Sequence, residues 1–308
     1  LLLADWLQHL QAAQLARVLH AAVALLKSRG PSEQLRYFPI DLRHGGAVHE
    51  GAAPESPLHG GRAVHLDLLL LPSIFAPEVW SYTFLEGLLQ KPLHEYAGKR
   101  LIELGTGSGW VSLALLRLTR SEHILGLDLN PEAVVMARVN ALLNSFDAAG
   151  RPDADRLYER FSAQESDLLA APRARHWTAD FVLGCIPQVI ATAGEASDSA
   201  RLYDLSNYFA AQGLVEDKFG LGLNARALRE ALSSLRPGGS VILNLAGRPG
   251  PAVVAHMFER RGYRPRVLWQ ARVEQAADTN IAPLVELEEQ SGKLFAYHLH
   301  RSSLESIS

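Results

Sequence analysis

From about residue 96 onward, the chain alternates between short apolar strands and helices, and this alternation limits the possible folds more than any other feature. Strands are predicted over 100–105, 123–129, within 156–169, over 179–186 and over 240–246, and helices over 109–118, 131–145, 223–235 and 252–262. Short strands joined by helices through short links are typical of a doubly wound α/β sheet, because parallel strands need crossover connections.

Two further strands, over 264–273 and 292–300, are predicted to be antiparallel neighbours at the carboxyl end. We therefore predict a Rossmann-like α/β fold, with a mostly parallel seven-stranded sheet and an antiparallel carboxyl-terminal strand, over residues 96–308. Residues 1–95 are predicted to form an amino-terminal helical and cap region. Its first part shows helical spacing of apolar residues and ends at Arg29-Gly30-Pro31, a helix stop signal.

Composition narrows the functional class. A formal net charge of −3 argues against a dedicated nucleic-acid binder. The amino end has no apolar run of the roughly 20 residues that a membrane span needs. A single cysteine excludes intramolecular disulfides and predicts a reducing, cytoplasmic setting, and the histidines at 44, 49, 59 and 65 have no metal-ligand spacing. A homo-oligomer is left open.

The segment "LIELGTGSGW" places Gly105, Gly107 and Gly109 between a predicted strand and a predicted helix. Glycine allows a tight turn and a close approach of the backbone to a ligand. Such a loop also suits a dinucleotide, so it does not identify the ligand by itself.

Three acids at successive strand ends separate these alternatives. Glu103, inside the strand before the loop, would repel a pyrophosphate but attract the sulfonium and ammonium of S-adenosylmethionine. Asp128 ends the next strand, where a carboxylate can accept hydrogen bonds from both hydroxyls of a ribose. Asp167 ends the third, where an adenine amino group is expected.

This ordered set resembles the class I S-adenosylmethionine-dependent methyltransferases. The resemblance implies a cofactor-binding set of Glu103, Gly105, Thr106, Gly107, Gly109, Asp128, Leu129, Asn130, Asp167, Leu168 and Cys185.

The fourth strand ends in "VLGCIPQVI", which contains the only cysteine. Ligands of such sheets bind beyond the carboxyl ends of the strands, so Cys185, Ile186, Pro187 and Gln188 are predicted to lie beside the methyl group. Many amino-methylating relatives have Asn-Pro-Pro-Tyr or Asp-Pro-Pro-Tyr here. On the shared Pro187, this chain has Cys185 for the Asn and Gln188 for the Tyr, so the groups that orient a planar amine are absent.

A thioether acceptor accounts for that absence. Its sulfur carries no proton, so methyl transfer needs no general base and no group that orients an N–H. Catalysis then depends on alignment and on the exclusion of water, and proximity of this kind contributes roughly 7–11 kcal/mol. The prediction is a site with no general base and with no metal.

Several stretches are similar to the methyltransferase portion of the methionine S-methyltransferase family known from plants. They are "PSIFAPEVWSYTFLEGL", "GLDLNPEAV", "GCIPQ", "LSNYFAAQGLVEDKFGLGLNARAL" and "LWQARVEQAADTNIAPLVELEEQS", among others over most of 70–291. The resemblance implies conversion of S-adenosylmethionine and L-methionine into S-methylmethionine and S-adenosylhomocysteine. The plant enzymes continue into an aminotransferase-like region, whereas this sequence stops at Ser308. A stand-alone bacterial form with a role in dimethylsulfoniopropionate synthesis is the resulting expectation.

Methionine needs a cation for its carboxylate and an acceptor for its ammonium. Arg248, after the fifth strand, is predicted to bind the carboxylate as a bidentate fork. Asn207 or Glu216 is predicted at the head group, Tyr208 beside the sulfur, and Tyr82 on one face with Trp80 and Phe84 if that segment is extended.

Two alternatives to this activity remain open, and a third is disfavoured. One is an N-methyltransferase of a protein glutamine or a small amine, and another is a catalytically silent S-adenosylmethionine-binding module. An NAD-dependent oxidoreductase is disfavoured by Glu103 and by the absence of a catalytic Tyr-Lys or His-Asp arrangement.

Overall fold

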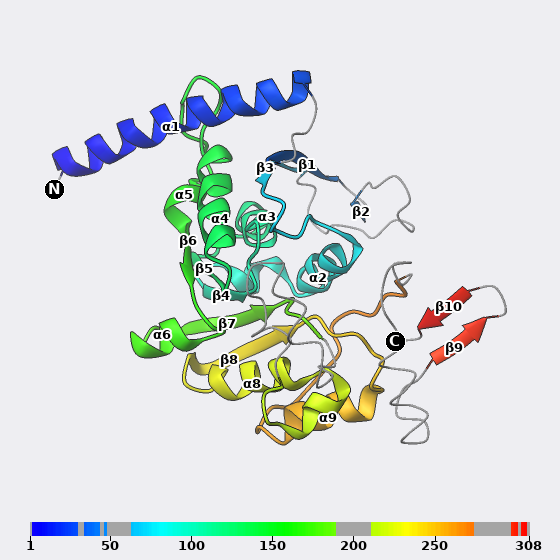
Figure 1. The fold of residues 1–308 in the computed structure, drawn as a ribbon. Coiled ribbons are helices and arrows are strands. Elements are labelled where there is room, and N and C mark those ends of the chain that lie inside the picture. Colours follow the sequence, from blue (N-terminus) through cyan, green and yellow to red (C-terminus); the bar gives the residue numbers. More distant parts are fainter. Residues whose placement is uncertain are drawn as a thin grey trace.

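The computed structural model describes residues 2–29, 34–43, 46–47, 63–188, 211–273, 297–300 and 303–306. At its centre is a five-stranded sheet in the order β6-β5-β4-β7-β8, in which every neighbouring pair is parallel (Figure 1). The strands are β4 (Arg100–Leu104), β5 (His123–Asp128), β6 (Phe161–Glu165), β7 (Ala179–Gly184) and β8 (Leu235–Leu243). The strand order reverses between β4 and β7, so the predicted doubly wound, Rossmann-like fold is confirmed.

Helices cover both faces of this sheet (Figure 1). One face carries α3 (Trp110–Leu118), α4 (Pro131–Leu143) and α2 (Val79–Leu89), and the other carries α8 (Gly222–Ala231) and α9 (Pro251–Glu259). Each face has its own apolar core. Leu113, Leu115 and Leu116 of α3 are fully buried in the first, and burial of one such side chain contributes roughly 1.5–3 kcal/mol.

The amino-terminal region contains a second sheet that the sequence analysis did not anticipate. Its strands are β1 (Arg36–Arg43), β2 (Gly46–Ala47) and β3 (Val64–Leu70), in the order β2-β1-β3 with antiparallel pairing. The long helix α1 (Leu2–Arg29) lies across α4 at the edge of the molecule (Figure 1). Between β1 and β3, residues 44–45 and 48–62 lie outside the described residues.

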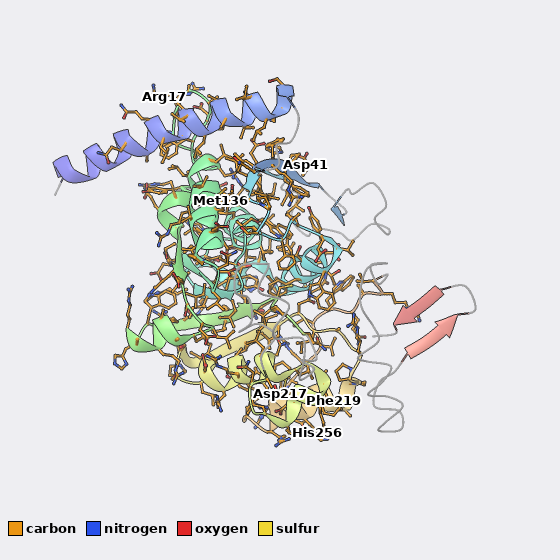
Figure 2. The ribbon with its side chains drawn as sticks, in the orientation of Figure 1. Arg17, Asp41, Met136, Asp217, Phe219 and His256 are labelled. Atoms are coloured by element: carbon orange, nitrogen blue, oxygen red, sulfur yellow. The ribbon has the colours of Figure 1, made fainter. Side chains whose placement is uncertain are left out.

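Two asparagines of α4 fasten this second sheet to the main domain. The Asn140 carboxamide accepts from the Leu69 N–H at 2.8 Å and donates to the Leu69 carbonyl at 3.1 Å. One helical turn later, Asn144 makes the same pair of bonds with Asp67 at 2.9 and 2.7 Å. Both carboxamides therefore imitate a neighbouring strand and satisfy the edge of β3. Met136 of the same helix is buried among the side chains of the core (Figure 2).

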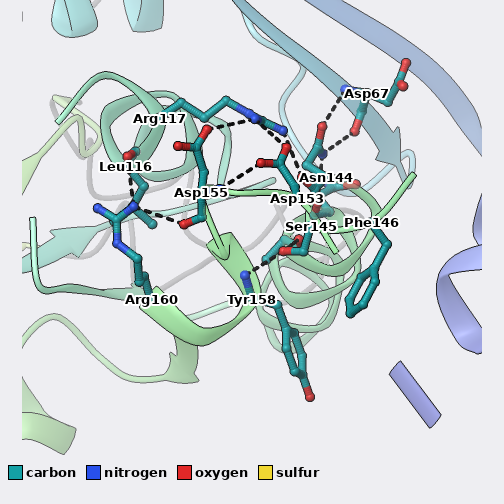
Figure 3. Close-up of polar contacts among 12 residues, drawn as sticks. Asp67, Leu116, Arg117, Asn144, Ser145, Phe146, Asp153, Asp155, Tyr158 and Arg160 are labelled. Carbon is teal, nitrogen blue, oxygen red and sulfur yellow. Dashed lines mark hydrogen bonds and ion pairs between the residues drawn. The ribbon is translucent and has the colours of Figure 1, made fainter. Parts of the chain in front are cut away.

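The connection between α4 and β6 is fixed by a half-buried arginine. Arg117 donates to the carboxylates of Asp153 at 2.8 Å and Asp155 at 3.0 Å, and to the Asn144 carbonyl at 2.8 Å (Figure 3). Arg160 donates to backbone carbonyls at the end of α3 and within this connection, including that of Leu116 at 3.3 Å (Figure 3). The small helix α5 (Leu157–Arg160) is thereby held against the end of α3.

The two strands predicted near the carboxyl end differ from the structure. Residues 264–273 form no strand, and Trp269 instead approaches α2, where a Cβ on Gly87 would lie 3.5 Å from the Trp269 Cβ. The strand within 292–300 is β9 (Tyr297–His300), which pairs with β10 (Ser303–Ser306) in a separate hairpin rather than joining the main sheet. The predicted seven-stranded sheet therefore has five strands among the described residues.

Candidate functional site

The glycine loop joins β4 to α3 at the carboxyl edge of the sheet. Gly105, Gly107 and Gly109 have φ angles of 67°, 52° and 80°, a left-handed conformation that L side chains rarely adopt. A Cβ on Gly109 would lie 3.1 Å from the Ala137 Cβ, so this glycine also allows α3 and α4 to pack closely. The loop is thus set by backbone conformation and by close helix packing.

Glu103 is buried directly beneath this loop. Its Oε2 accepts from the Thr106 hydroxyl at 2.8 Å and from the Ser112 hydroxyl at 2.5 Å. Burial raises the pKa of Glu103 to about 7, although the hydrogen bonds from Ser112 and Thr106 act in the opposite direction. Glu103 is therefore a buried acid that titrates near neutral pH, and a cation nearby would favour its ionised form.

Asp128 ends β5 and holds the next part of the loop. Its Oδ2 accepts from the Gly107 N–H at 2.8 Å and its Oδ1 from the Asn130 N–H at 2.9 Å. Asn130 uses its carboxamide oxygen to accept from the Glu132 N–H at 2.9 Å and its nitrogen to donate to the Ser73 carbonyl at 3.2 Å. The Asn130 side chain is therefore a helix cap, and its backbone N–H is engaged by Asp128. Leu129 lies between these two residues, half-buried.

Asp167 and Leu168 follow β6 at the same edge. The Ser166 N–H donates to the Asp128 carbonyl at 2.8 Å, which brings the ends of β5 and β6 together. Leu168 has a φ angle of 47°, unusual for a residue with a side chain. Asp167 is 41 % exposed and pairs with Arg226 Nη2 at 2.7 Å.

The segment after β7 packs directly against the glycine loop. A Cβ on Gly105 would lie 3.3 Å from Ile186 Cγ2 and 3.9 Å from the Cys185 carbonyl oxygen. Ile186 is buried, whereas Pro187 and Gln188 are half-buried. The structure therefore brings the predicted methyl-transfer segment beside the predicted cofactor loop.

Three carboxamides fasten this segment to its neighbours. Gln188 accepts from the Ala246 N–H at 2.8 Å and donates to the Ala246 carbonyl at 3.2 Å, so its side chain ties the segment to the exit of β8. Asn224 of α8, which is fully buried, donates to the Pro187 carbonyl at 3.3 Å. The Pro187 carbonyl therefore accepts a hydrogen bond from α8.

Asn244 is the third carboxamide, and the sequence analysis missed it. Its backbone N–H donates to the Gly184 carbonyl at 2.8 Å, and its Nδ2 donates to the Trp80 carbonyl at 2.9 Å and to Cys185 Sγ at 3.5 Å. This side chain therefore joins α2, β8 and the Cys185 segment. A polar residue at the end of the fifth apolar strand, "SVILNLA", was the available sequence signal.

Cys185 is a free thiol in this cluster. Burial raises its pKa to about 12, with the Asn244 hydrogen bond acting in the opposite direction and the charges of Glu103 and Glu78 adding to the rise. The thiol is therefore protonated at neutral pH and is not a nucleophile there.

The predicted acceptor-binding residues have different outcomes. Tyr82 is buried in α2 with its ring 4.8 Å from that of Trp110, and residues 80, 82 and 84 lie on a helix, so the prediction of one extended face was wrong. The Glu78 N–H donates to the Ser81 hydroxyl at the start of this helix, a capping contact that the sequence analysis overlooked. Arg248 lies half-buried in the turn after β8, while Asn207 and Tyr208 lie outside the described residues.

Both carboxylate oxygens of Glu216 are bound by one arginine. Glu216 lies in η4 (Val215–Phe219), and Arg261 Nη1 and Nη2 donate to its two oxygens at 2.8 and 3.1 Å. Its neighbour Asp217, which is labelled in Figure 2, accepts from the N–H groups of Gln212 and Leu214. Glu216 is nearly fully buried and forms a structural ion pair with Arg261, just after α9, and its head-group role stays a prediction.

Within the described ranges, no group of three or more His, Cys, Asp or Glu side chains could hold a metal ion. His65 instead pairs with Asp41 at 2.8 Å. Of the helices that the structure describes, none combines the length and the apolarity that crossing a membrane requires.

Comparison with known proteins gives related methyltransferases. The family described as "Ribosomal protein L11 methyltransferase (PrmA)" matches residues 84–171. The chain is 43 % identical to the methionine S-methyltransferase of Hordeum vulgare over 246 residues, which cover 76 % of this chain and 23 % of that protein. It is 32 % identical over 180 residues to a release factor glutamine methyltransferase of Cereibacter sphaeroides, covering 58 % and 56 % of the two chains.

Among solved structures, the chain resembles a T. thermophilus 16S rRNA N2 G1207 methyltransferase in complex with AdoMet and guanosine. The TM-score is 0.47 at 20 % identity, and the match covers 78 % of this chain and 49 % of the other. The match to the Hordeum vulgare methionine S-methyltransferase spans less than a quarter of the length of that protein.

Proposed function

Because the chain is a relative of the methionine S-methyltransferases over 76 % of its length, we propose that it transfers a methyl group from S-adenosyl-L-methionine to the thioether sulfur of L-methionine. The products are S-methyl-L-methionine and S-adenosylhomocysteine. The bond from the donor sulfonium to the methyl carbon breaks as the bond from the methionine sulfur forms, and no proton is released.

The donor site consists of the residues at the carboxyl ends of β4, β5 and β6. The left-handed glycines give the tight turn that allows the backbone of this loop to approach a nucleoside closely. Glu103 favours the cationic amino acid part of the donor. Asp128, whose two oxygens accept from the Gly107 and Asn130 N–H groups, is proposed to accept from the ribose hydroxyls, and Asp167 from the adenine amino group.

The single observation that carries the choice of acceptor is the segment beside the glycine loop. Cys185 and Gln188 stand where amine methyltransferases of this fold have polar and aromatic residues, and Gln188 spends its carboxamide on Ala246. The Cys185 thiol is protonated and accepts from Asn244. An acceptor that needs no deprotonation and no oriented N–H group fits this surface.

In the proposed mechanism, the three carboxamides hold the Cys185–Gln188 segment in place, so that the acceptor sulfur meets the methyl carbon in line. Pre-organisation of this kind contributes roughly 7–11 kcal/mol. Arg248 is proposed to bind the methionine carboxylate. No general base takes part in the proposed mechanism. At saturating methionine, the rate is therefore expected to vary across neutral pH only through the titration of Glu103.

A protein N5-glutamine methyltransferase is the second candidate, favoured by the similarity to release factor glutamine methyltransferases. A role of the product in dimethylsulfoniopropionate synthesis and a cytoplasmic location remain proposals from the sequence, as does the boundary between a cap region at 1–95 and the domain at 96–308.

The test is a reaction with S-adenosylmethionine that carries a labelled methyl group, with L-methionine as the acceptor. Labelled S-methylmethionine, identified by mass spectrometry, is the expected product. Arg248→Ala should raise the KM for methionine far more than that for the donor, with the exposed Arg175→Ala as the control. Formation of S-adenosylhomocysteine only when a protein or an amine is supplied would refute the proposal.

A further inference from the structure

One arginine lies between the adenine end of the proposed donor site and the rest of the fold. Arg226, on α8, directs its guanidinium at acceptors from three parts of the chain. Its Nη2 donates to Asp167 Oδ2 at 2.7 Å, its Nε to Glu230 Oε1 at 2.7 Å, and its Nη1 to Gln212 Oε1 at 3.2 Å. Its side chain is 22 % exposed, so these bonds are partly shielded from water.

The second oxygen of Glu230 extends this arrangement to the backbone. Glu230 Oε2 accepts from the Leu169 N–H at 3.1 Å, and the Glu230 side chain is only 7 % exposed. Arg226 and Glu230 therefore hold the turn after β6 on both sides, by the carboxylate of Asp167 and by the amide of Leu169. Leu168, between them, has the left-handed φ angle of 47°. Such a conformation costs free energy and persists where neighbouring contacts determine it.

We propose that Arg226 is a positioning residue that fixes the carboxylate of Asp167 and the left-handed turn at Leu168, so that the site selects adenine over other purines. The proposal rests on S-adenosylmethionine as the donor and extends it to a residue that does not touch the donor.

The chemistry follows from the two oxygens of Asp167. One is bound by Arg226, which fixes the plane of the carboxylate, and the other is left to accept from the exocyclic amino group of adenine. Hypoxanthine presents a carbonyl oxygen at that position, and two acceptors that face each other repel. A site whose polar group is held in place rejects the analogue that cannot pair with it, whereas a mobile carboxylate turns away and discriminates less. The planar fork of arginine is needed, because a lysine ammonium cannot bind three separate acceptors in one plane.

Gln212 adds a second consequence. Gln212 lies just before η4, later in the chain than Cys185. It accepts a hydrogen bond from the same guanidinium that binds Asp167. Arg226 therefore also connects the purine end of the site to the chain that follows the methyl-transfer end.

The experiment measures binding of S-adenosylhomocysteine and S-inosylhomocysteine by calorimetry, without any methyl acceptor. The variants are Arg226→Ala and Arg226→Lys, with Arg156→Ala as the control, since Arg156 forms an exposed ion pair with Glu159. The full-length chain should bind the adenosine compound at least tenfold more tightly than the inosine compound. Arg226→Ala should reduce that ratio at least fivefold, mainly through weaker binding of the adenosine compound, Arg226→Lys should recover only part of it, and Arg156→Ala should leave it unchanged.

An unchanged ratio in Arg226→Ala, or an equal loss of affinity for both compounds, would overturn the proposal. If Arg226→Ala does not fold, Asp167→Asn replaces it, because this variant keeps Arg226 but loses the carboxylate. A ratio that survives Asp167→Asn equally contradicts the proposal. Failure to methylate methionine leaves the ratio unaffected, so the failure of the proposed function would be seen separately.

Discussion

Glu103→Gln tests the physical character of the proposed donor site. The pKa of Glu103 is raised from the ordinary value of 4.5 to about 7, chiefly by burial. Between these two values, the folded chain keeps a proton that the unfolded chain has released. The folded state therefore loses stability as pH rises from 4.5 towards 7, and the loss is complete above the folded pKa.

The magnitude follows from the size of this shift. At about 1.4 kcal/mol per pKa unit, the rise from 4.5 to about 7 amounts to a destabilisation of about 3 kcal/mol at pH 8 relative to pH 4. Glutamine keeps the shape of the side chain and can still accept from the Ser112 and Thr106 hydroxyls, but it has no charge to bury. The variant should therefore gain stability over the original chain as pH rises through this window.

The assay is urea unfolding of both chains at pH 5, 6, 7 and 8. The difference in unfolding free energy should grow in favour of Glu103→Gln by about 2–3 kcal/mol from pH 5 to pH 8. Glu165→Gln, which changes an exposed acid at the end of β6, is the control and should give pH curves parallel to those of the original chain. If the unfolding free energies of Glu103→Gln and of the original chain also change in parallel with pH, the claim that Glu103 is a buried acid with a pKa near 7 is refuted. S-adenosylhomocysteine should bind the original chain more tightly as pH rises through 7, and Glu103→Gln should lose that dependence.

Three further predictions concern the carboxamides and the thiol. Asn140→Ala should lower the unfolding free energy by roughly 1–3 kcal/mol in urea titrations, because it leaves buried backbone groups of Leu69 unpaired; a change below a few tenths would contradict the strand-mimicking role. Asn244→Ala should reduce kcat for methionine at least tenfold while the Kd for S-adenosylhomocysteine changes less than threefold, and an equal effect on both would assign it to general stability. Cys185→Ala should retain most activity, and thiol labelling of the folded chain at pH 7.5 should be slow until urea unfolds it, since burial raises the thiol pKa; loss of activity would give the thiol a chemical role.

The sequence predicted the main sheet and the contents of its carboxyl edge. Apolar runs and glycines are local signals, and the topology of a doubly wound sheet brings successive strand ends together, so Glu103, Asp128 and Asp167 could be assigned before any coordinates. Cys185 could be placed beside the glycine loop by the same rule.

The rest depends on contacts between distant residues. Arg261 pairs with Glu216 across 45 positions of sequence, and this pairing engages both carboxylate oxygens of Glu216. Strand propensity over 264–273 has no effect, because a strand needs a neighbour for its ladder and Trp269 lies against α2. The role of Asn244 likewise depends on Trp80, which lies 164 residues away in the sequence.

The choice of acceptor is the central claim, and a competition in one reaction tests it most directly. The chain is incubated with methyl-labelled S-adenosylmethionine, L-methionine and a glutamine-containing peptide of the release-factor type at equal concentrations. The account predicts that the label enters S-methylmethionine at least a hundredfold faster than the peptide. Label in the peptide at a comparable or greater rate would contradict it.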